Sequence, residues 1–346
     1  MNFLPQIKLF DLYYGQPASG KSECAARVIE QVYRETGKKA RLVIGDGSLM
    51  TYRHLLDAGI AESVSFQARH WPTSVLYQLA SGWWPWFKAG ESDESHSELR
   101  PPDIPYIKDN IGIYVFEGIS TAATYMIGDI KGGCCWHAAH GTKIGQDASY
   151  KTVDADVDQK TGKAIEGTGP GLRWGGTAQA HYLYVQTKLP TIIQQSAGLP
   201  CHVIWTAHET VNDPEKNPLI KEQIAGPEVI GKALTDKIQR VFGNTVHMQS
   251  VGKRVKQDDA FTNRKVDEFD LEFRCYTRDH FHPNGTVLTR FKGCTRNVDA
   301  KKIAQYFVGA DAGVAILDYY KALHEISLGK QASLVGPKTI KGVETT

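Results

Sequence analysis

Residues 15–22 read Gly-Gln-Pro-Ala-Ser-Gly-Lys-Ser, which matches the phosphate-binding loop (P-loop) pattern G-x-x-x-x-G-K-S. The short apolar, aromatic-rich run at residues 9–14 precedes the loop and predicts a buried strand. After the loop, apolar residues recur at helical spacing over residues 23–36, and Gly37 predicts the end of that helix. The loop therefore lies in the strand–loop–helix context that makes the pattern specific.

The chemistry of this loop follows from its backbone. Glycines let the chain curl so that several N–H groups point at a polyphosphate, and the next helix presents its positive end to the same anion. Lys21 can reach the β- and γ-phosphates, and the Ser22 hydroxyl can ligate Mg²⁺. We therefore expect ATP and Mg²⁺ as cofactors. The residues expected to bind them in the loop are Gly15, Gln16, Pro17, Ala18, Ser19, Gly20, Lys21, Ser22 and Glu23.

The rest of the chain alternates strand patterns with helix patterns, which predicts an α/β fold with a mostly parallel sheet and helices on both faces. Further strands are expected at 40–44, 63–66, 111–116, 201–205, 244–249, 271–277 and 287–291. Further helices are expected at 52–58, 74–80, 120–131, 177–197, 228–241 and 312–328. The polar, proline-bearing residues 88–110 predict a surface loop.

Composition changes near the middle of the chain. Residues 132–176 are rich in glycine and lack apolar periodicity, and residues 153–165 within them predict a β-hairpin. We interpret this stretch as a β-rich insertion that divides the ATPase core into residues 1–131 and residues 177–330. The polar residues 331–346 predict a flexible tail.

Bulk properties exclude several classes of protein. The chain of 346 residues is 41% hydrophobic and 23% charged, as in ordinary globular proteins, and its net charge of +2 predicts no global polycation. It begins without a signal-peptide pattern and contains no apolar run of about 20 residues, so no membrane segment is expected. The six cysteines form no disulfide framework. These features favour a cytoplasmic location.

An acidic residue ends one of the most apolar predicted strands. Glu117 follows Ile113-Tyr114-Val115-Phe116, and P-loop proteins need a carboxylate at a neighbouring strand tip to hold Mg²⁺. Most such strands end in Asp, so Glu117 could instead be an ordinary exposed residue. We interpret Ser22 and Glu117 as the metal ligands.

Two further strand ends carry polar candidates for chemistry. Thr206 or His208 can touch the γ-phosphate from the end of the strand at 201–205, or the histidine can simply cap that strand. Asp46 follows the second strand and is the candidate for orienting water, with Gln67 as its rival. Either residue could instead belong to a surface turn.

Basic residues gather late in the chain. Residues 251–302 contain 12 Lys or Arg against 8 Asp or Glu, which is either a mild nucleic-acid-binding face or a solvated surface. Arg290, Lys292 and Arg296 lie where a cation could reach a neighbouring subunit's γ-phosphate, so we assign them to the nucleotide site of a homo-oligomer.

The ordered motifs GQPASGKS, YVFEGIS, CHVIWTAHE and GPEVIGKALTDKIQRVFGNTVHM, followed by the basic segment, resemble phage-encoded RecA/AAA-type P-loop ATPases. Some members of that group act in single-strand annealing and recombination. The resemblance covers residues 8–130 and 177–298. It implies a RecA-like sheet, Mg²⁺-dependent ATP hydrolysis, a host-cytoplasmic location and single-stranded DNA as partner.

The resemblance also assigns roles to residues. It implies that Lys21 and Ser22 bind phosphate and metal, that Glu117 holds the metal, and that His208 is the sensor. Residues 221–232 fall where RecA-type proteins place a DNA-facing loop. Glu rather than Asp at position 117, and the insertion at 132–176, depart from the family pattern.

Two alternative functions share the P-loop. A small-molecule or nucleoside kinase needs an arginine-rich lid, and residues 132–176 contain only one arginine, Arg173. A nucleotide-gated structural or packaging subunit would hydrolyse ATP slowly.

Overall fold

The computed structural model describes residues 8–66, 72–85, 99–131, 179–212, 224–229, 234, 237–258, 265–276, 290–291, 306–309 and 311–327. Its strands are β1 (Phe10–Gly15), β2 (Lys39–Ile44), β3 (Ala61–Ser65), β4 (Trp84–Pro85), β5 (Leu99–Arg100), β6 (Ile111–Glu117), β7 (His202–Asn212), β8 (Ile224–Pro227), β9 (Asn244–Asp258), β10 (Lys265–Tyr276), β11 (Arg290–Phe291) and β12 (Tyr306–Val308). Its helices are α1 (Lys21–Thr36), α2 (Arg53–Asp57), α3 (Pro72–Ala80), α4 (Ile104–Asn110), α5 (Ile119–Lys131), α8 (Gln179–Ser196) and α10 (Ala312–Ser327), with a 3₁₀ helix η1 (Gly47–Tyr52).

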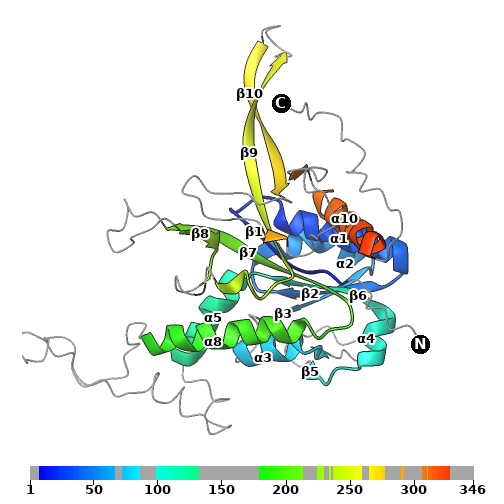
Figure 1. Cartoon of the computed structure of the whole chain (residues 1–346), viewed down its shortest axis with the longest axis vertical. Helices are drawn as coiled ribbons and strands as arrows, with labels where there is room; N and C mark the ends of the chain where they lie inside the picture. The colour runs from blue at the N-terminus through cyan, green and yellow to red at the C-terminus, as the bar shows by residue number, and fades with distance from the viewer. Residues whose placement is uncertain are drawn as a thin grey trace, which may run out of the picture.

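One sheet organises the molecule (Figure 1). Its strands run in the order β12-β10-β9-β1-β7-β6-β2-β3, with β11 beside β9 and β8 beside β7. The six strands from β9 to β3 in this order are parallel, whereas β10, β11, β12 and β8 join antiparallel. The P-loop strand β1 is central, and β7 separates it from the acid-bearing strand β6. The mostly parallel α/β fold predicted from the sequence is confirmed.

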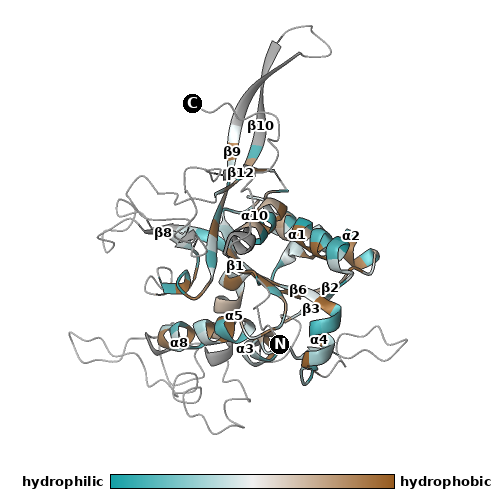
Figure 2. Cartoon of the chain, turned by 45° about the vertical axis from the view of Figure 1, so that its right-hand side comes forward, coloured by the Kyte–Doolittle hydropathy of each residue, from teal (hydrophilic) through white to brown (hydrophobic). Residues whose placement is uncertain are grey.

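Helices cover both faces of this sheet because successive strand residues alternate sides. On one face, Tyr114 and Phe116 of β6 belong to an apolar cluster with residues of α3, α5 and α8. On the other face, Ile113 and Val115 belong to a second cluster with residues of α1, α2 and α10. Figure 2 shows this pattern as hydrophobic strands in the middle of the fold and hydrophilic residues on α2 and α4 at its periphery. The site described below lies at the edge between these layers, where the parallel strands end.

Several element predictions are corrected by the structure. Residues 104–110 of the predicted surface loop form α4, because Asp103 caps that helix by accepting a hydrogen bond of 3.0 Å from the Tyr106 N–H. The strand predicted to end at Trp205 continues to Asn212, where it pairs with β8. Of the helix predicted at 228–241, Glu228 and Val229 are not helical, whereas residues 234, 237 and 238 are. The strand predicted at 287–291 is found at Arg290–Phe291 among the described residues.

Other predictions fall outside the described residues. These are the insertion at 132–176 with its hairpin, the tail at 331–346, Gln67, Lys292 and Arg296. The domain boundaries stay a prediction, although both parts of the predicted core contribute strands to one sheet. In the described part of the chain, no helix is long and apolar enough to span a membrane.

Candidate phosphate-binding site

The P-loop has the backbone conformation that its sequence predicts. It connects the last residue of β1, Gly15, to the first residue of α1, Lys21. Gly20 has φ 85° and Ala18 has φ 59°, both in the left-handed region where glycine is favoured. The Ser19 N–H donates to the Gln16 carbonyl at 3.2 Å and closes the turn. The curled backbone thus ends at the N-terminus of a 16-residue helix, which favours an anion.

The Lys21 ammonium is held at the mouth of this loop. The residue is only 8% exposed. Its Nζ donates to the Gly15 carbonyl at 3.0 Å, to the Gln16 carbonyl at 2.8 Å and to Ser19 Oγ at 3.3 Å. Burial lowers the pKa of Lys21, while nearby carboxylates, Glu117 first, oppose that shift. The loop therefore keeps a cation within reach of any anion that its N–H groups bind.

Strand register brings the other candidates to the same edge of the sheet. Gly15 pairs with His208, Phe116 with Trp205, and Ile44 with Glu117. The carboxyl ends of parallel strands are where ligands bind in open α/β sheets. A pocket of about 580 Å³ opens there. It is lined by Pro17, Ala18, Ser19, Gly20, Lys21, Ser22, Glu23, Cys24, Asp46, Gly47, Ser48, Thr51, Glu117, Gly118, Thr206, Ala207, His208, Phe273 and Gly309.

Glu117 is a buried carboxylate fixed from two sides. It is 3% exposed, so the alternative of an ordinary exposed strand-end residue is wrong. Thr206 Oγ1 donates to its Oε2 at 2.5 Å, and the Tyr52 hydroxyl donates to its Oε1. Burial raises the pKa of Glu117, and the hydrogen bonds from Thr206, Tyr52 and Ser22 oppose the shift. Strand β6 thus delivers one oriented acid beside the Ser22 hydroxyl.

These oxygens suit a Mg²⁺ ion. Magnesium is usually bound by one or two protein oxygens together with phosphate oxygens and water, not by a cage of protein ligands. Ser22 and Glu117 supply such a pair, and Glu117 has lone pairs beyond those used by Thr206 and Tyr52. Within the described residues, no group of three His, Cys, Asp or Glu side chains forms a separate metal site.

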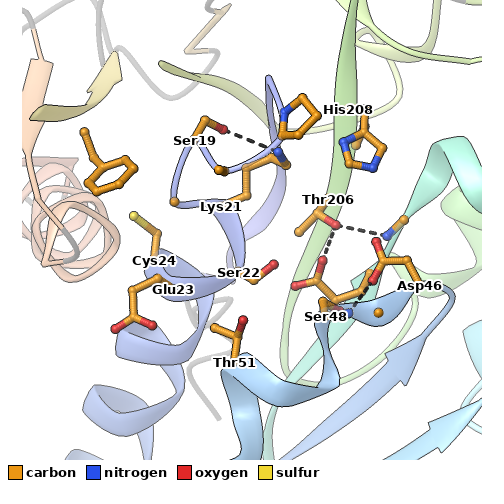
Figure 3. A pocket seen from close by; sticks show the side chains of 18 of the residues that line it. Ser19, Lys21, Ser22, Glu23, Cys24, Asp46, Ser48, Thr51, Thr206 and His208 are labelled. Carbon is orange, nitrogen blue, oxygen red and sulfur yellow. Dashed lines mark hydrogen bonds between the residues drawn. The ribbon is translucent and has the colours of Figure 1, made fainter. Parts of the chain in front are cut away.

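Asp46 lies at the pocket as well. It ends the turn after β2 and caps η1, where its Oδ1 accepts from the Ser48 N–H at 3.0 Å. Its second oxygen, Oδ2, lies close enough that a side chain at Gly118 would meet it at 3.2 Å. Asp46 and Glu117 therefore both line the pocket and lie close enough to interact electrostatically. Figure 3 shows Asp46 at this pocket together with Thr206 and His208. Its position in a turn at the pocket is compatible with either interpretation, and its role in orienting water stays a prediction.

His208 and Thr206 occupy different positions, although both were candidates for contact with the γ-phosphate. Thr206 is engaged by Glu117 and by the Gly118 N–H, which donates to its hydroxyl at 3.0 Å. His208 lines the pocket, and its Nδ1 is buried without a hydrogen-bond partner in the described chain. Its backbone N–H donates to Ser120 Oγ at 3.1 Å. Figure 3 shows His208 on the same side of the pocket as Lys21.

Two residues of the site were missed by sequence reasoning. Tyr52 comes from η1, which the sequence predicts only as part of a short helix. Phe273 lines the pocket from β10, where a Cβ at Gly20 would be in ordinary van der Waals contact with its ring, at 3.4 Å. No motif marks either residue, because each reaches the site only through the tertiary fold.

The late basic residues are not brought to this pocket by the described part of the chain. Arg290 pairs in β11 with Thr245 near the start of β9, and it is absent from the described pocket lining. The charged residues of the basic segment 251–302 are also unevenly distributed along the sequence. Residues 251–276 contain six Lys or Arg and six Asp or Glu, and the surplus of four cations falls in residues 277–302.

No protein-family model and no curated protein matches this chain. Among solved structures it is similar to a KaiC-like protein from the hyperthermophilic archaeon Pyrococcus horikoshii OT3, at 11% identity and a TM-score of 0.34, over 82% of this chain and 89% of that one. It is also similar to the flagellar accessory protein FlaH from Methanocaldococcus jannaschii, at 8% identity and a TM-score of 0.34, over 87% of this chain and 84% of that one. Scores at this level do not bear on what the chain binds. The strand order of its own sheet and its P-loop are those of the P-loop NTPase class of α/β folds.

Proposed function

We propose that this chain binds ATP and hydrolyses it with the help of Mg²⁺. The observation that carries the proposal is the meeting of Lys21 and Glu117 at one pocket, although nearly one hundred residues separate them in the sequence. An anion-binding loop alone is compatible with any phosphate ligand. A buried, oriented carboxylate beside the loop's serine hydroxyl is what a metal-assisted phosphoryl transfer requires.

Each residue of the site has its own role in this proposed reaction. The P-loop N–H groups and the N-terminus of α1 bind the phosphates, and Lys21 turns from the loop carbonyls to the β- and γ-phosphates. Ser22 and Glu117 would hold the Mg²⁺, which when bound would neutralise the charge that develops as the γ-phosphoryl group is transferred to water. Asp46 orients the attacking water, and the unpartnered Nδ1 of His208 meets the γ-phosphate.

The pocket also has an apolar end suited to a nucleoside. Cys24 lies one helical turn after Gly20, and its thiol approaches the Gly309 carbonyl at 3.9 Å. Phe273 is half-buried and lines the pocket beside Gly20. Aromatic rings stack on nucleobases without regard to base identity. We assign this end to the base and ribose of ATP.

A single substitution tests the proposal. Lys21→Ala should abolish phosphate release while the circular dichroism spectrum stays that of the wild type, because the hydrogen bonds of its ammonium to described residues all go to loop atoms. Lys108→Ala, on the exposed side of α4, is the matched control and should retain full activity. Full turnover by Lys21→Ala would sink the proposal. Detection of a phosphorylated acceptor in place of free phosphate would favour the kinase alternative.

We further propose that the chain acts as a homo-oligomer on single-stranded DNA, in keeping with its resemblance to phage recombination ATPases. The charge surplus at residues 277–302 supports this ligand, whereas the balanced residues 251–276 do not. DNA binding of this kind should release counterions and weaken steeply with salt. The test is the ATPase rate with and without single-stranded DNA across a salt series. No stimulation and no binding at low salt would favour the structural or packaging alternative.

A further inference from the structure

Strands β9 and β10 continue beyond the body of the sheet as a two-stranded ribbon (Figure 1). The pairing of β9 with β1 ends at Met248, so among the described strands residues 249–258 have only β10 as a neighbour. The pairing of β10 with β12 is limited to residues 274–276, and the Phe273 carbonyl accepts a hydrogen bond of 2.9 Å from the Gly309 N–H, so within the described chain residues 265–272 are open on that side. We call these two open borders the β9 edge (residues 249–258) and the β10 edge (residues 265–272).

The two edges carry opposite charge. The β9 edge contains Lys253, Arg254 and Lys256 against a single acid, Asp258. The β10 edge contains a single base, Lys265, against four acids. These acids are Asp267, Glu268, Asp270 and Glu272. Over a length of roughly 30 Å, at about 3.4 Å per residue, one border is basic and the other is acidic.

Pairing inside the ribbon explains only part of this asymmetry. In the ladder, Lys256 is opposite Asp267 and Lys253 is opposite Asp270, as suits a stable antiparallel pair. However, Arg254 is opposite Phe269, Glu268 is opposite Val255, and Glu272 is opposite Val251. Arg254 and Glu268 therefore have no opposite charge across the ladder, and each adds to the sign of its own edge. Glu272 instead forms an ion pair of 2.6 Å with Arg274 on its own strand.

We propose that the β9 edge of one copy of this chain pairs with the β10 edge of a second copy. An open strand edge presents unpaired N–H and C=O groups that another strand can bind, and natural proteins control such edges with charge. Here, β9 against β9 places bases together and β10 against β10 places acids together. Only the β9-to-β10 contact between copies is attractive.

This contact joins unlike surfaces, so each copy offers one edge to each of two neighbours. Heterologous contacts of this kind produce closed rings or open filaments, whereas a two-fold dimer would need the same edge on both sides. The inference gives an interface to the proposed homo-oligomer and does not require hydrolysis. It also connects assembly to the nucleotide pocket, because Phe273, which directly follows the β10 edge, lines that pocket.

Charge reversal on one edge at a time tests the pairing. Variant A carries Lys253→Glu and Lys256→Glu, so both of its edges are acidic. Variant B carries Asp267→Lys and Asp270→Lys, so both of its edges are basic. Sedimentation velocity, at low salt with a non-hydrolysable ATP analogue, measures the size of each protein alone and of an equimolar mixture. A control with Lys38→Glu and Lys108→Glu makes the same charge change as variant A away from the ribbon.

The wild type and the control should assemble, and high salt should dissociate them because exposed charges are screened. Variant A alone and variant B alone should each need at least tenfold more protein to assemble than the wild type. The equimolar mixture should assemble like the wild type, because copies of A and B can then alternate. Loss in A and B without recovery in the mixture would mean that the charges act only within one ribbon, and would overturn the proposal. If A and B each assembled like the wild type, the proposed contact between the β9 and β10 edges would be wrong, but the proposal of a homo-oligomer would stand. A monomeric wild type would overturn both, and ATP turnover by that monomer would leave the ATPase proposal standing.

Discussion

The Thr206 hydroxyl lies between the Gly118 N–H, from which it accepts a hydrogen bond of 3.0 Å, and Glu117 Oε2, to which it donates one of 2.5 Å. This hydroxyl therefore has no rotational freedom, and it fixes the carboxylate of the neighbouring strand. Sequence reasoning offered Thr206 as a possible phosphate contact. The structure shows that its hydroxyl contacts Glu117, while Thr206 and His208 both line the pocket, so the identity of the phosphate contact stays a prediction.

The first prediction concerns the contact between Thr206 and Glu117. Thr206→Val keeps the shape of the side chain but removes the donor to Glu117, so the carboxylate is held only from its other side. We expect the Mg²⁺-dependent ATPase rate to fall by roughly 10- to 150-fold, since one hydrogen bond to a charged group is worth ~1.5–3 kcal/mol. A titration of the rate against Mg²⁺ measures it. Thr210→Val, further along β7 and outside the described pocket lining, is the control. Equal Mg²⁺ curves for Thr206→Val and the wild type would contradict this role.

The second prediction separates the two ends of the pocket. Phe273→Ala should weaken ATP binding roughly tenfold, as loss of one base–aromatic stack does. Binding of inorganic tripolyphosphate should be unchanged, because that ligand has no nucleoside. Phe273→Tyr keeps the ring and should restore ATP affinity. Calorimetric titration of both ligands measures these changes. Equal weakening of both ligands would show that Phe273 supports the P-loop and not the nucleoside.

Some residues of the site could be predicted from the sequence, and others could not. Lys21, Ser22 and Glu117 were predictable because each lies in a local pattern, a loop motif or a strand end, and because parallel strands end at one edge. Tyr52 and Phe273 were not, since their positions depend on how η1 and β10 pack in three dimensions. The length of the β9–β10 ribbon was also not predictable. Charged residues interrupt its apolar alternation, which hides a strand from periodicity.

The third prediction concerns a buried acid in the P-loop strand. Asp11 is fully buried on β1, and burial raises the pKa of its carboxyl to about 8 despite a hydrogen bond of 2.8 Å from Asn244 Nδ2. Below about pH 4 the group is protonated in both the folded and unfolded chain, and its full contribution to stability is present. Between about pH 4 and pH 8 only the unfolded chain releases the proton. Stability should therefore fall as pH rises through this window.

Urea unfolding at several pH values measures this slope. The contribution of Asp11 should approach about 1.4 kcal/mol per pH unit for one proton. Asp11→Asn cannot ionise, so it should remove this slope and unfold at higher urea than the wild type near pH 8. Because other titratable groups are common to both proteins, the difference between the two curves isolates Asp11. Parallel curves for the wild type and Asp11→Asn would exclude a buried, titrating acid at this position.

The last prediction concerns the close approach of two backbones beneath the P-loop. A Cβ at Gly15 would lie 1.9 Å from the Met248 carbonyl oxygen and 2.8 Å from Ser19 Oγ. The first neighbour is a backbone atom of the paired strand β9, so it can move only if β9 moves away from β1. Gly15→Ala should therefore destabilise the fold by ~1–3 kcal/mol and weaken ATP binding by distorting the loop. Gly128→Ala, in α5 with open space around the added methyl group, should be neutral or stabilising. Urea midpoints and ATP titrations of both variants measure the contrast, and a Gly15→Ala protein as stable as Gly128→Ala would show that the two backbones do not approach this closely.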